Sequence, residues 1–439
     1  MSVKDENICI LGLGYVGLTL SLTLTNFGKK VVGIETNKEI IESLENDEPH
    51  FFEAGLKDSL IEAKNKSSFK ISNDIKDAKD CSVFIISVGT PLDERGIASF
   101  ASIDRCIKDI ISVIPKSPLI IVRSTVKIGT TRNRVAKIFE EANLVCDIAM
   151  CPERTAEGKA MTEITLMPQI IGGLDSESSK RAQILFSEFN KNILVVSNPE
   201  TAELIKLVDN STRDLGFAVS NEIANICEVL NLDVYEVISN ATEKYHRTNI
   251  PLPGLVGGPC LEKDPYILYQ SLKDLDHKSN IFKEAREINE KMAKSFLPWI
   301  GKISQNSSFG IAGLAFKGSP ETSDLRGSLS IDVFNELQRI TPDKINLFDP
   351  VKKVTKTQDY SNHFSNGKWF GDFEELISET NVLIICNNHS FFKDLLNPNK
   401  IWEINPNIEV YDFWNNLSEK LIKKNLNKYK VFGRALRND

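Results

Sequence analysis

The segment Gly12-Leu-Gly14-Tyr-Val-Gly17 restricts the possible folds of this chain more than any other stretch. It follows an apolar run at 8–11 and precedes an apolar segment that we expect to be a helix. A second apolar run at 31–34 then ends at Glu35. A strand, a glycine turn, a helix, a second strand and an acid, in this order, form the dinucleotide-binding unit of Rossmann folds. The chain is therefore expected to begin with an α/β domain built on a parallel sheet.

The glycines and the acid each have a physical role in such a unit. Gly12 makes the turn, Gly14 lets a pyrophosphate approach the backbone, and Gly17 allows the helix to pack closely on the sheet. The pyrophosphate would lie at the helix N-terminus. Glu35 favours NAD over NADP, because a carboxylate there binds both ribose hydroxyls and repels a 2′-phosphate. The alternative is a glycine turn without a nucleotide. We expect cofactor contacts from Gly12, Gly14, Tyr15, Val16, Gly17 and Glu35.

Three further strands are expected to end in polar residues. The apolar runs lie at 82–88, 119–122 and 147–150. Ligands bind beyond the carboxyl ends of strands in open α/β sheets, so the residues that follow these runs are candidates for the site. Polar residues at strand ends also serve as simple turn formers, and that alternative stays open for each of them. A strand at 193–196 closes the first domain, 1–198. The candidates are Gly89, Thr90, Pro91, Thr125 and Glu153.

In the segment 199–300 the short apolar runs give way to the longer apolar pattern of helices, which predicts an all-helical middle domain. Residues 199–230 have the apolar pattern of one long helix. Lys206 and Asn210 are four residues apart on it and therefore share one face. A lysine in a largely apolar helix either extends its ammonium group to solvent or faces a site. Long amphipathic helices between two domains commonly form a dimer interface, so a homodimer is expected.

The sequence Leu255-Val-Gly-Gly-Pro-Cys260-Leu-Glu-Lys-Asp264 marks a second candidate site within this helical region. Gly257 and Gly258 let the backbone approach a ligand closely. A helix that starts near Leu261 would lower the pKa of the Cys260 thiol and place Asp264 one turn along. The alternative is that Cys260 is a small buried hydrophobic residue, as free cysteines usually are.

Residues 301–439 predict a second α/β domain. Apolar runs at 309–316, 344–349, 382–386, 408–412 and 429–432 read as strands. This half lacks a complete G-x-G-x-x-G, which argues against a second dinucleotide site. Lys317 and Arg326, together with nearby serines, have the chemistry to bind a diphosphate. A solvated basic loop is the alternative.

Composition excludes several other classes of protein. The net charge of −7 argues against nucleic acid as a partner. The eight cysteines and five histidines are scattered without ligand spacing, so we expect neither a metal site nor a disulfide framework. No apolar run approaches the ~20 residues that span a bilayer. Because the first residues are charged and lead directly into a strand, we expect no signal peptide and a cytoplasmic location.

Seven motifs, taken together, resemble the UDP-glucose/GDP-mannose dehydrogenase family in order and spacing, from about residue 7 to about residue 433. They are Gly12-Leu-Gly-Tyr-Val-Gly17, Val88-Gly-Thr-Pro91, Arg123-Ser-Thr-Val126, Cys151-Pro-Glu-Arg-Thr-Ala-Glu157-Gly158, Glu203-Leu-Ile-Lys206 with Asn210, Gly257-Gly-Pro-Cys260 with Lys263-Asp264, and Phe316-Lys317. The resemblance implies an NAD-binding Rossmann domain, a helical dimerising middle domain and a Rossmann-like domain for the nucleotide of a UDP-sugar.

The resemblance also implies a reaction, the oxidation of a sugar C6 alcohol to a carboxylate with two NAD⁺ reduced. Cys260 would attack the intermediate aldehyde, and water would hydrolyse the resulting thioester. Lys206 and Asp264 match the acid/base and oxyanion-stabilising pair. Glu157 matches a carboxylate that helps hydrolysis, and Thr125 a position near that water. The substrate contacts implied in this way are Glu153, Arg154, Lys206, Asn210, Arg247, Asn249, Gly254, Gly257, Phe316, Lys317 and Arg326.

Several departures from the family pattern bear on the choice of sugar. Glu35 stands where aspartate is usual, and Arg154 stands where phenylalanine usually follows Glu153. Pro259 and Leu261 replace the Ser-Cys-Phe form of UDP-glucose enzymes, and Asp412-Phe-Trp-Asn replaces their Asp-x-Arg-Asn. These features are closer to the branch that oxidises UDP-N-acetylhexosamines, of the mannosamine or glucosamine type.

Three alternatives remain. The first is a UDP-glucose dehydrogenase. The second is a β-hydroxyacid dehydrogenase, which oxidises once and needs neither the cysteine nor the C-terminal domain. The third is a non-catalytic sensor of NAD or a nucleotide sugar, which would make Cys260, Lys206 and Asp264 incidental.

Overall fold

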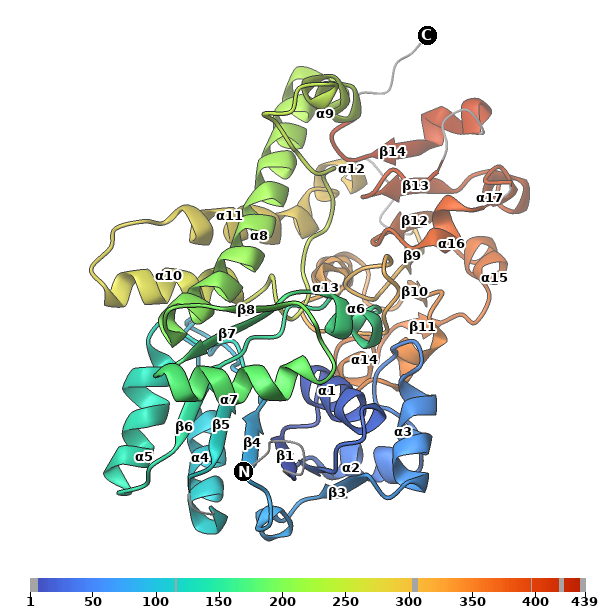
Figure 1. Cartoon of the computed structure of the whole chain (residues 1–439). Coiled ribbons are helices and arrows are strands. Elements are labelled where there is room, and N and C mark those ends of the chain that lie inside the picture. Colours follow the sequence, from blue (N-terminus) through green and yellow to red (C-terminus); the bar gives the residue numbers. More distant parts are fainter. Residues whose placement is uncertain (1–6, 115–116, 302–306, 396, 418–421, 435–439) are drawn as a thin grey trace. The chain divides into compact units, whose positions relative to one another are not determined.

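The computed structural model describes residues 7–434 except 115–116, 302–306, 396 and 418–421. The chain packs as two compact units, and each contains one β-sheet covered by helices (Figure 1). Unit 1 consists of Met1–Asn210 with Tyr266–Ser279, and unit 2 of Ser211–Pro265 with Asn280–Asp439. Two of the three boundaries fall inside helices, α8 (Pro199–Leu230) and α10 (Asp264–Asp274), and the third follows Ser279, beyond the end of α10.

The sheet of unit 1 has the strand order β3-β2-β1-β4-β5-β6-β7-β8. Pairing is parallel from β3 to β6, β7 runs antiparallel to β6, and β8 is parallel to β7. The order reverses between β1 and β4, which is where ligands bind in doubly wound sheets. The strands are β1 (Ile8–Leu11), β2 (Val31–Ile34), β3 (Phe69–Ser72), β4 (Val83–Ile86), β5 (Leu119–Val122), β6 (Asp147–Met150), β7 (Gln169–Gly173) and β8 (Ile193–Val195).

Helices bury both faces of this sheet. Ile8 and Ile10 enter a core with α1, α3, α6 and α7, whereas Cys9 and Leu11 enter a second core with α4 and α5. Because the central strands are buried on both faces, their sequences are continuously apolar rather than alternating. The helices are α1 (Tyr15–Asn26), α2 (Lys38–Glu45), α3 (Leu56–Asn65), α4 (Ala101–Val113), α5 (Lys137–Glu141), α6 (Ala160–Leu166) and α7 (Ser176–Ser187).

The sheet of unit 2 has the order β11-β10-β9-β12-β13-β14, and all its pairs are parallel. This order repeats that of β3-β2-β1-β4-β5-β6 in unit 1. The strands are β9 (Phe309–Ala312), β10 (Ile345–Phe348), β11 (Lys368–Trp369), β12 (Val382–Ile385), β13 (Glu409–Asp412) and β14 (Tyr429–Val431).

Within unit 2, the helical segment packs against one face of this sheet. Ala224 of α8, Ile238 of α9 and Phe296 share a core with Ile311 of β9. The other face carries a separate core that includes α15 and α17. The helices are α9 (Val234–Thr242), α11 (Ile281–Lys291), α12 (Leu297–Ile300), α13 (Leu329–Ile340), α14 (Gln358–His363), α15 (Phe373–Ser378), α16 (Ser390–Lys393) and α17 (Lys400–Ile404).

The predicted fold class, two doubly wound α/β sheets with helices between them in sequence, is confirmed. The predicted division into 1–198, 199–300 and 301–439 stays a prediction. The segment 199–300 is helical, but it is shared between the two compact units and does not pack as a unit of its own. Each half of α8 buries its apolar side within a different unit, because residues up to 210 pack with unit 1 and the later ones with unit 2.

Candidate active site

The glycine turn between β1 and α1 has the geometry of a dinucleotide-binding turn. Gly12 has a φ of +90°, which favours glycine strongly. A Cβ atom at Gly17 would lie 1.8 Å from the Gly12 carbonyl oxygen, so a larger residue would separate α1 from the turn. At Gly14 an added Cβ would meet no atom within 4 Å. The turn is therefore closed on the side of the sheet and open at Gly14, where a ligand would approach.

The start of α1 suits an anionic ligand. Within the described residues it has no side-chain cap and no acid in its first turn, so its N–H groups can donate to a pyrophosphate. Glu35 accepts backbone N–H groups from Leu13 at 2.8 Å and from Thr36 and Asn37 at 2.8 and 2.9 Å. A cavity of about 340 Å³ lies beside Glu35 and is also lined by Gly12, Thr36 and Arg105. These features fit the two phosphates and a ribose of NAD.

The ends of β4 and β5 bring two predicted site residues together. The Thr90 hydroxyl donates to the Thr125 carbonyl oxygen at 2.7 Å, and the Ser124 hydroxyl donates to the Val88 carbonyl oxygen at 2.6 Å. Thr90 is buried, and the backbone at Gly89 is open. The two strand ends are therefore fixed relative to each other at the carboxyl edge of the sheet. Pro91 lies in the same segment, where its carbonyl oxygen accepts the N–H of Ser99.

Glu153, at the end of β6, belongs to a buried ion pair with Arg123. Arg123 donates to the Glu153 carboxylate, to the Cys151 carbonyl oxygen at 3.1 Å and to Gln169 at 3.0 Å. The N–H groups of Arg154 and Thr155 also donate to Glu153, at 2.7 and 2.8 Å. Burial alone would raise the pKa of Glu153, but Arg123 and these two N–H groups hold it below its ordinary value. The carboxylate thus organises the strand end, and its predicted contact with substrate stays a prediction.

The turn at 156–158, which carries Glu157, is held by a set of hydrogen bonds that was not predicted from the sequence. The Tyr15 hydroxyl donates to the Glu53 carboxylate, and the Gly158 N–H donates to the same carboxylate at 2.7 Å. Gly158 also donates to the Tyr15 hydroxyl at 3.1 Å. Burial and Glu53 raise the pKa of Tyr15, so it remains a hydrogen donor. The first residue of α1 is therefore bonded to the turn next to Glu157.

The first part of α8 carries Lys206 and Asn210, and both side chains are buried. One turn before Lys206, Glu203 accepts the N–H groups of Gly129 and Thr131 at 2.5 and 2.7 Å. Burial raises the pKa of Glu203 to about 7 despite these donors. The predicted substrate residue Arg154 donates to Asp209 of the same helix at 2.7 Å. Loops after β5 and β6 are therefore tied to the helix that bears Lys206.

In unit 2, Cys260 is the one exposed cysteine among the eight, all of which lie in the described part of the chain. The alternative of a small buried hydrophobic residue is therefore wrong. The expected helix start near Leu261 is also wrong. Helix α10 begins at Asp264, and Cys260 lies in the turn before it, where its carbonyl oxygen accepts the N–H of Asp264 at 3.0 Å. Pro265 sits in the first turn of α10, a favoured place for proline. The Asp264 side chain is fully buried, with the Lys263 ammonium at 3.1 Å.

The glycines before Cys260 allow close contact with the loop after β9. Gly258 has a φ of +95°, and a Cβ atom there would lie 2.5 Å from the Phe316 ring. A Cβ atom at Gly257 would lie 2.0 Å from the Gly327 carbonyl oxygen. The Gly258 N–H donates to that same oxygen at 2.9 Å. The cysteine turn and the predicted substrate loop 316–327 are thus packed backbone to backbone.

The other predicted substrate residues of unit 2 lie around this contact or in the loop before it. Gly254 packs closely against the Trp414 indole, because a Cβ atom at Gly254 would lie 2.6 Å from that ring. Arg326 Nε donates to both carboxylate oxygens of Asp324 at 3.0 Å, and this pairing holds the guanidinium group of Arg326 at the loop. The Lys317 ammonium is 5.3 Å from the centre of the Phe316 ring. Arg247 and Asn249 are exposed.

A buried polar network, which was not predicted from the sequence, supports the cysteine turn. Arg286 of α11 donates to Asp214 of α8 at 2.7 Å and to the Val256 carbonyl oxygen at 2.7 Å. Asn289 donates to the Asp214 carboxylate at 2.9 Å. Asn221 exchanges two hydrogen bonds with the backbone of Gly254, at 2.9 and 3.2 Å. Arg286 also donates to the Leu261 carbonyl oxygen at 3.5 Å, so both ends of the 254–261 segment are held by α8 and α11. The signal in the sequence was a charged residue at a core-facing position of each helix.

The predicted catalytic residues are divided between the two units. Thr125, Glu157, Lys206 and Asn210 belong to unit 1, and Cys260 and Asp264 belong to unit 2. Within the described residues, no group of histidine, cysteine, aspartate and glutamate is arranged to hold a metal ion. No helix in the described part of the chain is long and apolar enough to cross a membrane.

Comparison with known proteins defines the class to which this fold and site belong. Three models of the UDP-glucose/GDP-mannose dehydrogenase family match in order: the NAD binding domain at 6–190, the central domain at 200–291 and the UDP binding domain at 310–419. The chain belongs to the UDP-glucose/GDP-mannose dehydrogenase family. It is accordingly an oxidoreductase that uses NAD and acts on a CH–OH group.

Particular relatives extend over almost the whole chain. A UDP-N-acetyl-D-mannosamine dehydrogenase of Methanococcus maripaludis (strain C7) is 30% identical over 441 residues, covering 98% of this chain and 97% of its own length. The structure of a UDP-D-ManNAc dehydrogenase from Pyrococcus horikoshii aligns with a TM-score of 0.84 at 26% identity, over 98% of this chain and 100% of that one. A UDP-N-acetyl-mannosamine dehydrogenase from Staphylococcus aureus aligns with a TM-score of 0.82 at 26% identity, over 97% and 98%.

Proposed function

We propose that this protein oxidises the C6 alcohol of a UDP-N-acetylhexosamine to the carboxylate in two NAD-dependent steps. The sugar is of the mannosamine or glucosamine type, and the mannosamine form is favoured by the names of the relatives. The observation that carries the proposal is the exposed Cys260 on a glycine turn next to the buried Asp264. A reachable thiol of this kind can hold the aldehyde covalently between the two oxidations.

Several residues of the chain take part in the first oxidation, each with its own role. When bound, NAD⁺ supplies the hydride acceptor for both steps, at the site formed by the Gly14 turn, α1 and Glu35. The C6 hydroxyl loses its proton to a base as the hydride leaves carbon, which gives an aldehyde. The Lys206 ammonium and the Asn210 amide can donate hydrogen bonds to the developing C6 alkoxide. We assign the proton transfer to the pair Lys206 and Asp264.

The second oxidation takes place on the cysteine. The Cys260 thiolate adds to the aldehyde carbon, so that a C–S bond forms and the carbonyl oxygen takes up a proton. The second hydride then leaves that carbon for NAD⁺ while the hydroxyl proton passes to a base, which gives a thioester. Water breaks the C–S bond and gives the carboxylate and the Cys260 thiol. One water is consumed and two NAD⁺ are reduced for each sugar. Glu157 orients or deprotonates that water, and Thr125 lies near it.

A panel of nucleotide sugars tests the choice of substrate. We expect kcat/KM to be highest for UDP-N-acetylmannosamine or UDP-N-acetylglucosamine, because Arg154 and Trp414 replace the residues typical of UDP-glucose enzymes. UDP-glucose, UDP-N-acetylgalactosamine and GDP-mannose complete the panel. A preference for UDP-glucose would refute the assignment of the sugar while leaving the two-step chemistry intact.

We also infer a homodimer. In unit 2, the second half of α8 exposes Val219, Ile226 and Leu230, which recur at spacings of seven and four and so form one apolar stripe. A contiguous exposed apolar surface of this kind marks an interface. Light scattering on the wild-type protein should give twice the chain mass of 49.2 kDa. The Ile226→Glu variant should be a monomer, and a monomeric wild type would contradict the inference.

The cellular setting follows from the cysteines and the substrates. None of the eight cysteines, all of which lie within the described residues, forms a disulfide, which is typical of a reducing compartment. We place the enzyme in the cytoplasm, where it would draw on NAD and a UDP-sugar. Its product, a charged UDP-linked uronic acid, suits the assembly of an acidic polysaccharide. No nucleic acid or membrane partner is proposed.

A further inference from the structure

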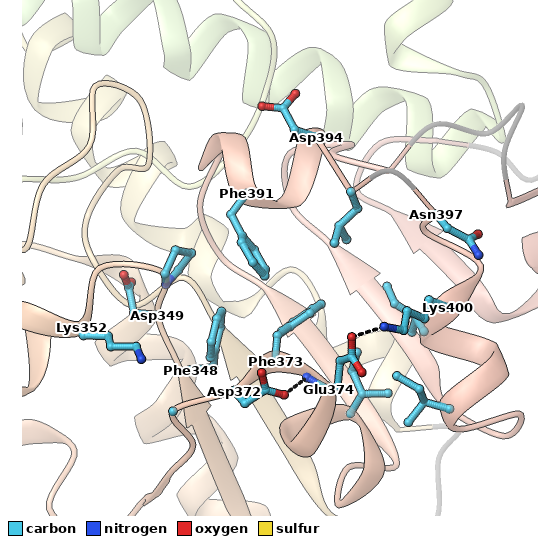
Figure 2. Close-up of a pocket in the computed structure, with 16 residues that line it drawn as sticks. Phe348, Asp349, Lys352, Asp372, Phe373, Glu374, Phe391, Asp394, Asn397 and Lys400 are labelled. Atoms are coloured by element: carbon cyan, nitrogen blue, oxygen red, sulfur yellow. Dashed lines mark hydrogen bonds and ion pairs between the residues drawn. The ribbon is translucent and has the colours of Figure 1, made fainter.

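A second cavity, of about 690 Å³, lies in unit 2 at the carboxyl end of β10 (Figure 2). The rings of Phe348, Phe373 and Phe391 gather into one wall, with ring centres 5.2 to 5.5 Å apart. The remaining apolar lining is aliphatic and includes Ile377, Leu395, Ile401 and Ile404. An apolar hollow with a few polar groups at its edge is the usual form of a small-molecule site.

The proposed dehydrogenase reaction does not use this cavity. The described residues that line it do not include Phe316, Lys317 or Arg326, the C-terminal residues assigned above to the UDP-sugar. They come instead from the loop after β10, from α15 and from the segment of α16 and α17.

The cavity occupies the same topological position as the cavity beside Glu35 in unit 1. Each lies between the end of the second strand of its sheet and the helices after the fourth, β2 and α4 in unit 1 and β10 with α16 and α17 in unit 2. Asp349 follows β10 as Glu35 follows β2. Glu35 accepts the N–H of Leu13, and Asp349 accepts those of Leu314 and Ala315 at 2.6 and 3.0 Å, in both cases from the loop after the first strand. In dinucleotide-binding sheets this position receives a ribose.

Two of the helix N-termini in unit 2 differ from that of α1 in unit 1. Among the described residues, the N-terminus of α13 is capped by Ser328 and that of α15 by Asp372, so their first N–H groups already have acceptors. The cavity is lined by four carboxylates and two lysines. One of these lysines, Lys400, is paired with Glu374. The excess of negative charge disfavours an anionic ligand and admits an uncharged one.

We propose that this cavity binds an uncharged purine nucleoside. The base would stack on the wall of phenylalanine rings, and the ribose would lie at the Asp349 end of the cavity, which corresponds to the Glu35 position in unit 1. The volume supports a bicyclic base, because the cavity is about twice as large as the 340 Å³ beside Glu35. A purine also covers more of the aromatic wall than a pyrimidine and so buries more apolar surface.

Equilibrium dialysis of the full chain with radiolabelled adenosine tests the proposal. Saturating NADH and UDP are included, so that the cofactor site and the substrate site cannot bind the probe. We expect one adenosine per chain under these conditions, with weaker binding of AMP and uridine. If NADH or UDP abolishes adenosine binding, the probe occupies one of the known sites and the proposal is wrong.

Two cavity variants and one control variant test whether adenosine binds in the cavity. Phe391→Ala removes part of the aromatic wall and should weaken adenosine binding by about tenfold or more. Leu395→Asp adds a charge to the half-buried lining and should have a similar effect, and it serves as a second test should Phe391→Ala fold poorly. Tyr360→Ala is the matched control, because Tyr360 is a half-buried aromatic residue of the same domain outside the cavity. Unchanged binding in both cavity variants would overturn the proposal.

Discussion

Replacing Arg286 by methionine should disrupt the support of the cysteine turn. Arg286 and Asp214 are 1% and 0% exposed and form an ion pair at 2.7 Å. Arg286 also donates to the Val256 carbonyl oxygen at 2.7 Å, four residues before Cys260. Removing one partner of a buried ion pair costs about 3–5 kcal/mol, because the other charge remains buried without compensation. We therefore expect Arg286→Met to lose about that much free energy of unfolding and most of its kcat.

The loss should depend on pH in a defined direction. Burial raises the pKa of Asp214, and Arg286 opposes this rise. Without Arg286 the pKa of Asp214 in the folded state rises further above its unfolded value. A carboxyl group of this kind stabilises the fold at low pH relative to high pH, and this contribution is lost as pH rises through the folded-state pKa. The difference between Arg286→Met and wild type should therefore shrink as pH falls from neutral to about 5.

Urea unfolding at the two pH values measures both effects. Lys283→Met is the matched control, because it breaks the exposed pair of Lys283 and Glu287 on the same helix. That pair should be worth less than about 1 kcal/mol. The double variant Asp214→Asn with Arg286→Met should regain part of the stability, since no buried charge is left uncompensated. Equal stability of Arg286→Met and wild type, or a loss that does not change with pH, would refute the reasoning.

Three further predictions concern unit 1. Gly17→Ala should abolish NADH binding or prevent folding, because its Cβ atom would lie 1.8 Å from the Gly12 carbonyl oxygen. Gly14→Ala meets no atom within 4 Å and should keep the melting temperature while weakening NADH binding, as measured by fluorescence titration; unchanged affinity would show that no ligand approaches there. For Glu203, whose pKa burial raises to about 7, stability should fall as pH rises from about 4.5 to about 7. Glu203→Gln should flatten that slope, and an unchanged slope would contradict the assigned pKa.

The first sheet and its glycine turn were predictable because the residues that determine them lie close together in the sequence. A strand, glycines at fixed spacing and an acid at the next strand end can be identified within 8–35, and a buried parallel sheet requires continuous apolar runs. The later apolar runs also become strands, and most of these are buried. The exception is β8, where Leu194 and Val195 are about half exposed. The start of α10 was misplaced by three residues, because a turn held by Gly258 and Pro259 precedes it.

The supporting interactions could not be predicted, because they join residues far apart in the chain. Glu53 meets Tyr15 and Gly158 only after folding, and Arg286 meets Asp214 across 72 positions. A single sequence carries no sign of such partners beyond the unusual presence of a charge at a core-facing position. The same holds for Glu153, which the sequence places at a strand end but whose pairing with Arg123 depends on the neighbouring strand.

The central claim, two oxidations through Cys260, is tested most directly by counting NADH per sugar. Purified protein is given limiting UDP-N-acetylmannosamine with excess NAD⁺, and NADH is measured by absorbance while the sugar product is identified by mass spectrometry. We predict two NADH and one uronic acid per sugar for the wild type. Cys260→Ser should still bind NAD⁺ but form no uronic acid. One NADH per sugar with an aldehyde or ketone product, or full uronic acid formation by Cys260→Ser, would contradict the account.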